Sequence, residues 1–354
     1  MDQVASARKV AYHTERLASY LGGEPVFPVT LELDITSHCT RVCEHCPSSR
    51  SEYQHSLSFP FIEELLASLE GQTRGLLLSG GEPTMSPHFP AVLALARDRG
   101  FEDIAVVTNG SLLHKREVAQ ALAEHASTIR VSIYDWDRGS CRAIDDTLLR
   151  VEGLRKYIDV EEAMVKIGIS ALTSSDRASR LCDLTRRVRS SGAHWIYFHP
   201  MCDGWEDGNV ARMDQTGVPA VLRSLVLSST QEFGVHYLEA RYDNIRPDFS
   251  GYHAAHFLMV VGADGKNYLG AEVKYQDRFA IADVLGKMKP GFLQDPDRLS
   301  RIASVRGAEY TAAAGLHRGV LYSHHIEQLL RSPESSVESL LGAGSNHFSF
   351  PHIL

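Results

Sequence analysis

Short apolar runs alternate with amphipathic segments along the first part of the chain. Apolar runs of about four to eight residues are typical of buried parallel strands, and apolar residues spaced three and four apart are typical of helices. The pattern predicts six strands, at residues 29–35, 75–78, 103–108, 129–134, 164–172 and 194–199. Helices are predicted between them, at residues 60–69, 89–96, 115–125, 148–158 and 177–190.

A strand followed by a helix, repeated along the chain, predicts a parallel sheet with right-handed crossovers. Six such units are fewer than the eight of a closed barrel. We therefore expect an α/β fold, a partial (β/α)6 TIM-like barrel spanning residues 29–205. In such barrels the loops after the strand C-termini build the active site, so those loops hold the first candidates for chemistry.

Three further parts flank the predicted barrel. They are an N-terminal helical segment at residues 1–28, a helical connector at 206–250 with a helix at 218–233, and a small C-terminal α+β domain at 251–354. The last contains two apolar runs, residues 257–261 and 267–269, joined by a turn with Asp264-Gly265, which is the pattern of a β-hairpin.

Composition narrows the possible partners and location. The chain has 354 residues, 44% of them hydrophobic, and a formal net charge of −8, which argues against a nucleic-acid partner. No apolar run approaches the roughly 20 residues that cross a bilayer. The N-terminus mixes charges with apolar residues and so does not read as a signal peptide. We expect a cytoplasmic protein with neither a nucleic-acid nor a membrane partner.

Three of the six cysteines, Cys39, Cys43 and Cys46, stand in a C-x3-C-x2-C spacing directly after the first predicted strand. Three thiolates on one short loop can ligate three corners of a [4Fe–4S] cluster and leave one iron open. The alternative is a zinc site with His38 or His45 as fourth ligand. Structural zinc sites usually pair two C-x2-C halves, and the sequence holds no second half.

This spacing at the end of a first barrel strand, with an aromatic residue before the third cysteine, resembles the radical S-adenosylmethionine (SAM) superfamily. The resemblance implies one [4Fe–4S] cluster on Cys39, Cys43 and Cys46 and SAM as cofactors. It implies reductive cleavage of SAM to a 5′-deoxyadenosyl radical that abstracts hydrogen from a substrate, with flavodoxin or ferredoxin as electron donor. His45 takes the aromatic position and is expected near the adenine.

Further motifs follow the next strands in the order of that superfamily. The sequence Gly80-Gly81-Glu82-Pro83 resembles its GGEP motif, which holds the SAM amino group: glycines permit close backbone approach, and a glutamate accepts hydrogen bonds from an ammonium. Thr108 and Asn109, at the end of strand three, and Ser132, in strand four, resemble its ribose and carboxylate contacts. Arg142, which follows strand four, resembles a carboxylate contact but is equally consistent with a surface residue. The candidate SAM contacts are His45, Ser79, Gly80, Gly81, Glu82, Pro83, Thr108, Asn109, Ser132 and Arg142.

Residues 257–275 resemble the hairpin of a SPASM or twitch domain, which carries auxiliary clusters in many of these enzymes. No cysteine occurs after Cys202, so we expect the shell of such a domain without its clusters. The remaining cysteines, Cys141, Cys182 and Cys202, are too widely separated to favour an auxiliary cluster between them. An enzyme without an auxiliary electron acceptor favours a redox-neutral outcome such as epimerisation.

Cys202 follows the sixth strand and is the leading candidate for a hydrogen-atom donor to a substrate radical. The alternative is a small buried hydrophobic residue, which free cysteine often is. Cys141 is the second candidate donor, and Cys182 lies in the middle of a predicted helix and is expected in the hydrophobic core. His199 is a candidate general base, or equally a histidine whose hydrogen bonds are satisfied at a strand end.

The resulting hypothesis is a radical SAM isomerase acting on a polar small molecule of the sugar, aminocyclitol or nucleoside kind, in antibiotic or other natural-product biosynthesis. One alternative is a peptide-modifying maturase. Another is a small-molecule dehydrogenase, dehydratase or decarboxylase of the same superfamily. A non-catalytic iron–sulfur or zinc protein is a further alternative, but it leaves the GGEP motif unexplained.

Overall fold

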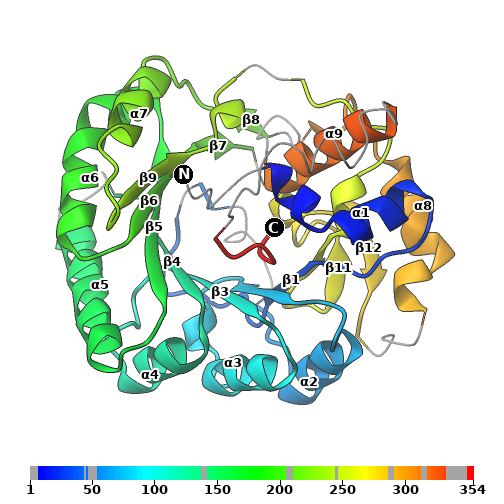
Figure 1. The fold of residues 1–354 in the computed structure, drawn as a ribbon, viewed down its shortest axis with the longest axis horizontal. Coiled ribbons are helices and arrows are strands. Elements are labelled where there is room, and N and C mark those ends of the chain that lie inside the picture. Colours follow the sequence, from blue (N-terminus) through cyan, green and yellow to red (C-terminus); the bar gives the residue numbers. More distant parts are fainter. Residues whose placement is uncertain are drawn as a thin grey trace.

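The computed structural model describes residues 7–43, 45–46, 54–136, 142–204, 210–243, 246–285, 291–311, 317–331 and 349–354. One sheet of ten strands runs through it (Figure 1). Its strand order is β12 (Ala280–Asp283), β11 (Lys266–Tyr268), β10 (Leu258–Val261), β1 (Thr30–Asp34), β2 (Gly75–Ser79), β3 (Asp103–Thr108), β4 (Thr128–Ser132), β5 (Lys166–Thr173), β6 (Trp195–Pro200) and β9 (Gly234–Tyr237). A separate pair, β7 (Cys202–Asp203) and β8 (Ala211–Arg212), follows β6.

The six predicted strands are confirmed as β1 to β6, and each pairs in parallel with the next. Two further parallel strands extend this sheet: β10 pairs with β1, and β9 pairs with β6. The predicted helix at 218–233 is shorter in the structure, α7 (Val218–Val226), and β9 begins at Gly234. In the described part of the chain the edge strands β12 and β9 do not pair, so the barrel is open.

Helices cover the outer face of the sheet, and the strands curve around an interior that holds the C-terminal segment (Figure 1). The side chains of β1 alternate between the two faces of the sheet: Leu31 and Leu33 belong to the outer core, whereas Glu32 lines the interior. The predicted helix at 177–190 is divided, because its first turns are 3-10 (η3, Ser175–Arg180). The outer helices are α2 (Phe59–Ser68), α3 (Phe89–Asp98), α4 (Arg116–His125), α5 (Arg142–Val160) and α6 (Leu181–Ser190).

A second hydrophobic core joins the N-terminal segment to the C-terminal part of the chain. It includes Leu17, Phe257 and Ile326, all fully or almost fully buried. The longer elements here are η1 (Ala7–Tyr12), α1 (Thr14–Leu21), η5 (His253–His256), α8 (Pro296–Ser304) and α9 (Arg318–Arg331). The short 3-10 turns of the chain are η2 (Pro83–Met85), η4 (Glu239–Arg241), η6 (Ala271–Val273), η7 (Asp277–Phe279) and η8 (Phe292–Gln294). No helix in the described residues is long and apolar enough to span a membrane.

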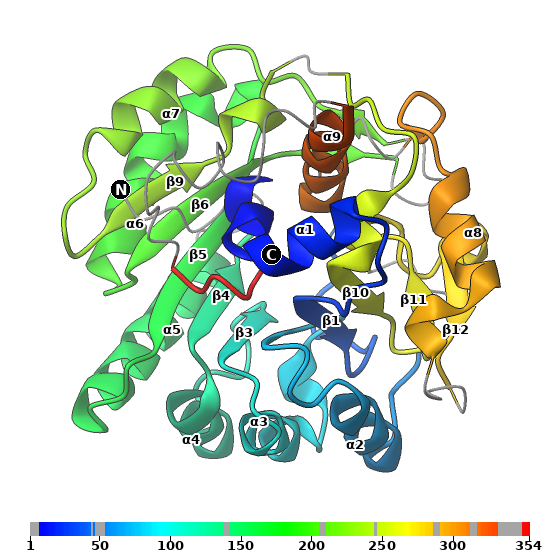
Figure 2. The ribbon, with the colours of Figure 1, turned by 45° about the vertical axis from the view of Figure 1, so that its right-hand side comes forward.

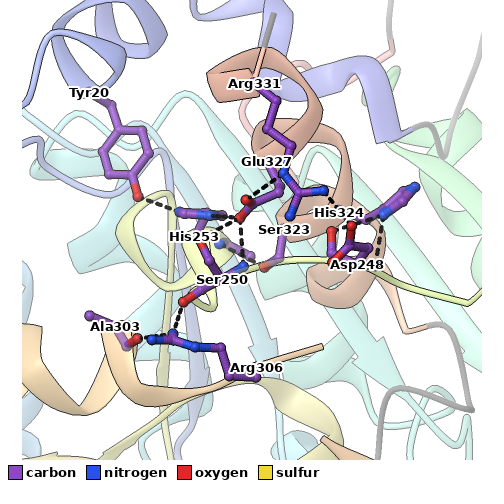
Figure 3. A network of polar contacts seen from close by, with 11 residues as sticks. Tyr20, Asp248, Ser250, His253, Ala303, Arg306, Ser323, His324, Glu327 and Arg331 are labelled. Atoms are coloured by element: carbon purple, nitrogen blue, oxygen red, sulfur yellow. Dashed lines mark hydrogen bonds and ion pairs between the residues drawn. The ribbon is translucent and has the colours of Figure 1, made fainter. Parts of the chain in front are cut away.

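A polar network fastens α1, η5 and α9 together (Figure 3). The Tyr20 hydroxyl lies 2.7 Å from His253 Nδ1, and His253 Nε2 lies 2.9 Å from the Glu327 carboxylate. The same carboxylate accepts hydrogen bonds from Ser250 N at 2.6 Å and from Arg331 Nε at 3.0 Å. Glu327 therefore connects three segments that are far apart in sequence.

The C-terminal segment, residues 349–354, lies inside the barrel at the N-terminal ends of its first strands (Figure 2). His352 N donates to Asp103 Oδ2 at 2.9 Å, and Leu354 N donates to Thr30 Oγ1 at 3.0 Å. Gly75 must be a glycine here, because a Cβ atom would lie 1.8 Å from His352 O. The segment therefore closes the end of the barrel opposite the cysteine loop.

Candidate active site

The cysteine loop leaves the C-terminal end of β1. Its base is closed by two hydrogen bonds, from Ser37 N to His55 O at 2.9 Å and from His55 N to Ser37 Oγ at 2.8 Å. Between them the loop carries Cys39, Cys43 and Cys46, all half-buried. The three predicted cluster ligands are thus presented by one anchored segment, at the end of the barrel where active sites of this architecture form.

Two N–H groups approach the sulfur of Cys39: Arg41 N at 3.4 Å and Asn109 Nδ2 at 3.5 Å. Hydrogen bonds of this kind stabilise a negatively charged sulfur. Cys43 has a different environment, since burial, followed by the nearby Asp135 carboxylate, raises the pKa of its thiol to about 12. This thiol stays protonated until a metal displaces its proton.

Gly80 and Gly81 pack against the backbone of the cysteine loop. Gly80 has φ +118°, and a Cβ atom there would lie 2.4 Å from Thr36 O. A Cβ atom on Gly81 would lie 2.2 Å from His38 O. Two backbone hydrogen bonds use this close approach, from Gly81 N to Thr36 O at 3.0 Å and from Glu82 N to His38 O at 2.7 Å. The glycine pair therefore fixes the cysteine loop against the end of β2.

Glu82 is fully buried and ties the GGEP motif to the segment after β3. Its Oε1 accepts hydrogen bonds from Thr84 Oγ1 at 2.5 Å and Thr108 Oγ1 at 2.7 Å, and from Thr84 N at 3.2 Å. Its Oε2 accepts one from Asn109 N at 2.6 Å. Pro83, the next residue, begins η2. Sequence reasoning assigned Glu82 to the SAM ammonium and missed this connection, which the parallel order of β2 and β3 implied.

Ser79, at the end of β2, joins a buried polar cluster. Its hydroxyl donates to Asp34 Oδ1 at 2.6 Å, and Lys274 Nζ lies 2.8 Å from the same oxygen. The Tyr275 hydroxyl donates to Asp34 Oδ2 at 2.7 Å. The cluster therefore links the strand that leads into the cysteine loop to residues that follow η6.

Glu32 extends this cluster into the barrel. Its Oε1 lies 3.1 Å from Lys274 Nζ, and its Oε2 pairs with Arg318. Burial opposes ionisation of Glu32, but the positive charges of Lys274 and Arg318 outweigh it and lower the pKa of this carboxyl to about 2. Burial likewise opposes the charge on Lys274, but Asp34 and Glu32 outweigh it and raise the pKa of this amine.

A cavity of about 220 Å³ occupies the barrel interior. Its wall extends from His45 of the cysteine loop to Leu354 of the C-terminal segment. Cys202 is also in the wall; its side chain is buried, with Sγ 3.7 Å from Pro200 O. Burial raises the pKa of the Cys202 thiol, so at neutral pH the sulfur keeps its hydrogen.

His199 lines the same cavity from the end of β6. Its Nδ1 accepts a hydrogen bond from Arg241 NH1 at 2.6 Å, which places the ring hydrogen on Nε2. Burial, followed by the charge of Arg241, lowers the pKa of His199 well below its usual value, so the ring stays neutral. In this arrangement His199 is a hydrogen-bond donor at Nε2, and its one acceptor nitrogen is occupied.

Residues 33–187 match the family model of the Radical SAM superfamily. Residues 33–187 therefore form a radical SAM domain. Among curated relatives, Fe-coproporphyrin III synthase of Methanosarcina barkeri is 28% identical over 144 residues, which are 38% of this chain and 35% of the relative. A probable GTP 3′,8-cyclase of Methanococcus maripaludis is 30% identical over 180 residues, 49% of this chain and 60% of the relative.

The chain thus spans between about a third and three fifths of the length of those relatives. Among solved structures, Streptococcus suis SuiB bound to S-adenosylmethionine aligns with a TM-score of 0.61 and 14% identity. The alignment covers 83% of this chain and 72% of SuiB. At that identity the likeness establishes the fold, and it agrees with the partial TIM-like barrel described above.

Members of the superfamily use a [4Fe–4S] cluster and SAM, and the match of residues 33–187 to the family model gives this chain the same cofactors. Three thiols are the soft donor set that an iron–sulfur cluster takes. Among the described residues no group of three or more His, Cys, Asp or Glu side chains is gathered for a metal. His45 supports the fit, because it is buried and neither ring nitrogen has a partner among the described residues. A cofactor bound beside Cys46 would supply a hydrogen-bond partner for this ring.

Of the other residues predicted from sequence, the structure describes the surroundings of Ser132 and Cys182 but not those of Cys141 or the Arg142 side chain. Ser132 ends β4 and is half-buried. Arg142 begins α5, but its side chain and Cys141 lie outside the described part of the chain. The prediction that Cys182 lies in the core is wrong, because the second position of α6 faces solvent. The buried residues of that helix are Leu181, Leu184, Thr185 and Val188.

Proposed function

We propose that this radical SAM enzyme acts on a polar small molecule held in the barrel cavity, with a redox-neutral outcome such as epimerisation. Sugars, aminocyclitols and nucleosides, as in antibiotic biosynthesis, are the proposed substrate kinds. The observation that carries the proposal is the position of Cys202. Its buried, protonated thiol stands in the wall of the cavity that also reaches His45, beside the proposed cluster ligand Cys46.

When bound and reduced by one electron, the cluster and SAM supply a 5′-deoxyadenosyl radical that takes a hydrogen atom from a substrate carbon. Cys202 then gives its hydrogen atom to the other face of that carbon: the S–H bond breaks, a C–H bond forms, and an unpaired electron remains on sulfur. One further electron and one proton restore the thiol. A flavodoxin or ferredoxin is the proposed source of both electrons.

The proposal includes Cys39, Cys43 and Cys46 as the cluster ligands and the GGEP, Thr108-Asn109 and Ser132 positions as parts of the SAM site. It also treats residues 251–354 as a counterpart of a SPASM or twitch domain that holds no cluster. The support is that residues 203–354 contain no cysteine. Without auxiliary cysteines in this segment, a two-electron oxidation has no acceptor there.

The test begins with the anaerobically reconstituted protein, SAM and a chemical reductant, together with panels of sugars, aminocyclitols and nucleosides. A substrate is recognised by 5′-deoxyadenosine formation above the level without it. In D₂O a cysteine donor predicts one solvent deuterium at the inverted carbon, because S–H exchanges with solvent. Cys202→Ala should still form 5′-deoxyadenosine but yield no inverted product.

Cys182→Ala is the matched control, because Cys182 is exposed on α6, and it should behave like the wild type. Unchanged inversion by Cys202→Ala would remove Cys202 as donor. A product oxidised by two electrons would contradict the redox-neutral outcome. Stimulation by peptides but by none of the small molecules would replace the proposed substrate with a peptide.

A further inference from the structure

The wall of the barrel cavity carries more positive than negative charge among its described residues, although the whole chain has a formal net charge of −8. Its carboxylate, Glu32, pairs with Lys274 and Arg318. The cationic residues of the wall are Lys9, Arg130, Arg241 and Arg318. A cavity of this composition favours a negatively charged occupant.

Arg130 is the cation in this wall that lacks a partner among the described residues. It lies on the interior face of β4, and its Nε is buried. That Nε has no hydrogen-bond partner among the described residues. Burial lowers the pKa of Arg130; the charge of Arg318 adds to this effect, whereas Tyr134 and Glu32 oppose it. An unpaired buried charge is costly, so a ligand that supplies acceptor oxygens here gains binding free energy.

Trp195 supplies a second donor to the same wall. Gly168 stands opposite Arg130 on β5, and Trp195 stands opposite Gly168 on β6. A Cβ atom on Gly168 would lie 2.0 Å from the Trp195 ring, so the indole lies over β5 and toward β4. The buried Trp195 Nε1 has no hydrogen-bond acceptor among the described residues.

His199 adds a third donor from the same side of the barrel. Its Nε2 carries the ring hydrogen, because Arg241 donates to Nδ1 at 2.6 Å, and it is buried without a partner among the described residues. Its ring lies 4.2 Å from that of Tyr197. The ring orientation is therefore fixed before any ligand binds. Three hydrogen-bond donors in one wall therefore lack acceptors among the described residues. A carboxylate or phosphate group supplies several acceptor oxygens.

We propose that the substrate carries a carboxylate or phosphate group and that Arg130, with the N–H groups of Trp195 and His199, binds this group inside the barrel. The inference rests on the proposed function, because it takes the cavity as the substrate site. It narrows the substrate to anionic members of the proposed classes, such as sugar acids and phosphorylated sugars or nucleosides.

The test measures binding of inorganic phosphate and of acetate to the anaerobically reconstituted protein by equilibrium dialysis, with and without saturating SAM. We expect the wild type to bind at least one probe when SAM is present. Arg130→Met keeps the length of the side chain but removes the charge, and it should weaken that probe about tenfold or more. Trp195→Phe removes only the indole N–H and should weaken it a few-fold. Arg186→Met is the control, because Arg186 is exposed on α6 and its loss changes the net charge equally.

Protein folding is checked independently of binding. Arg130→Met should not lower the melting temperature without ligand, because it removes an unpaired buried charge. Addition of the bound probe should raise the melting temperature of the wild type and leave that of Arg130→Met unchanged. If Arg130→Met does not fold, Arg130→Lys and Trp195→Phe decide, and unaltered probe affinity in both contradicts the proposal.

The SAM carboxylate is the other possible source of an anion at this site. If SAM displaces the probe, or Arg130→Met loses SAM affinity, the site holds the SAM carboxylate and the substrate proposal is overturned, while the proposed function stands. No probe binding by the wild type, or equal binding by Arg130→Met, also overturns it. A wild type that binds the probe but never cleaves SAM would instead refute the proposed function.

Discussion

Replacing Glu82 with glutamine separates a structural role of this carboxylate from a role in holding SAM. The side chain is fully buried and accepts four hydrogen bonds from Thr84, Thr108 and Asn109. Glutamine offers one oxygen and one NH₂ group, so either Asn109 N or the donors around Oε1 then face a donor. Glu82→Gln should therefore destabilise the protein before any cofactor binds.

The magnitude follows from the lost contacts. Hydrogen bonds to charged groups contribute about 1.5–3 kcal/mol each, and a buried donor left unpaired costs a similar amount. One lost bond, together with the weakening of the other three, gives about 3 kcal/mol. For 354 residues the unfolding entropy is about 0.7 kcal/mol/K, so the melting temperature should fall by roughly 4 °C.

The assay is thermal and urea unfolding of the metal-free protein under anaerobic conditions, for the wild type, Glu82→Gln and Glu64→Gln. Glu64 is exposed on α2, and its replacement should change stability by less than about 0.5 kcal/mol. If the metal-free Glu82→Gln protein unfolds like the wild type while SAM affinity falls, Glu82 acts through SAM alone. That result would refute the structural role of the Glu82 carboxylate.

Three further predictions follow from the structure. Reconstituted wild type should hold about four irons per chain, and Cys46→Ser should lose them; about eight irons in the wild type would reveal an auxiliary cluster and contradict the cluster-free C-terminal region. Hydrogen bonds from Ser250 and His253 outweigh burial and lower the pKa of Glu327 to about 2. The stability that the lowered pKa of Glu327 contributes is present above the ordinary glutamate pKa of about 4.3 and is lost as pH falls toward 2. Glu327→Gln should therefore flatten the acid limb of a melting-temperature profile between about pH 4.5 and 2, whereas a Glu327→Gln profile parallel to that of exposed Glu309→Gln would argue against it. Gly75→Ala should destabilise by about 1–3 kcal/mol in urea unfolding, because its methyl group overlaps His352 O, whereas Gly153→Ala, with open space around it in α5, should not.

The barrel strands were predictable because their signals are local. Each of β1 to β6 is a short apolar run, and such runs are buried on both faces of a parallel sheet. The strand β9 gave no comparable signal, since residues 234–237 are few and include His236. The pairing of β10 with β1 joins residues more than two hundred positions apart, and no local pattern encodes a partner at that distance.

The candidate site was predictable to the same degree. Spacing was sufficient to place Cys39, Cys43 and Cys46 on one loop at a strand end. Arg130 and Trp195 in the cavity wall were missed, although alternation along β4 points Arg130 inward with Thr128 and Ser132. A charged residue on the interior face of a parallel strand is the signal that was available. The hydrogen bond from Asn109 N to Glu82 was also missed, although the predicted order of β2 and β3 makes the C-terminal ends of these strands neighbours.

The buried cluster around Glu32 and Asp34 shows that the barrel and the C-terminal region depend on each other. Lys274 and Arg318 supply the charges that compensate these two carboxylates inside the fold. Without them, two buried carboxylates would lack counter-ions, and breaking a buried pair costs about 3–5 kcal/mol. Asp34 is also the last residue of β1, directly before the segment that carries the cysteines. The C-terminal region therefore helps to set the position of the cysteine loop, and the alignment of the loop with the cavity depends on residues far along the chain.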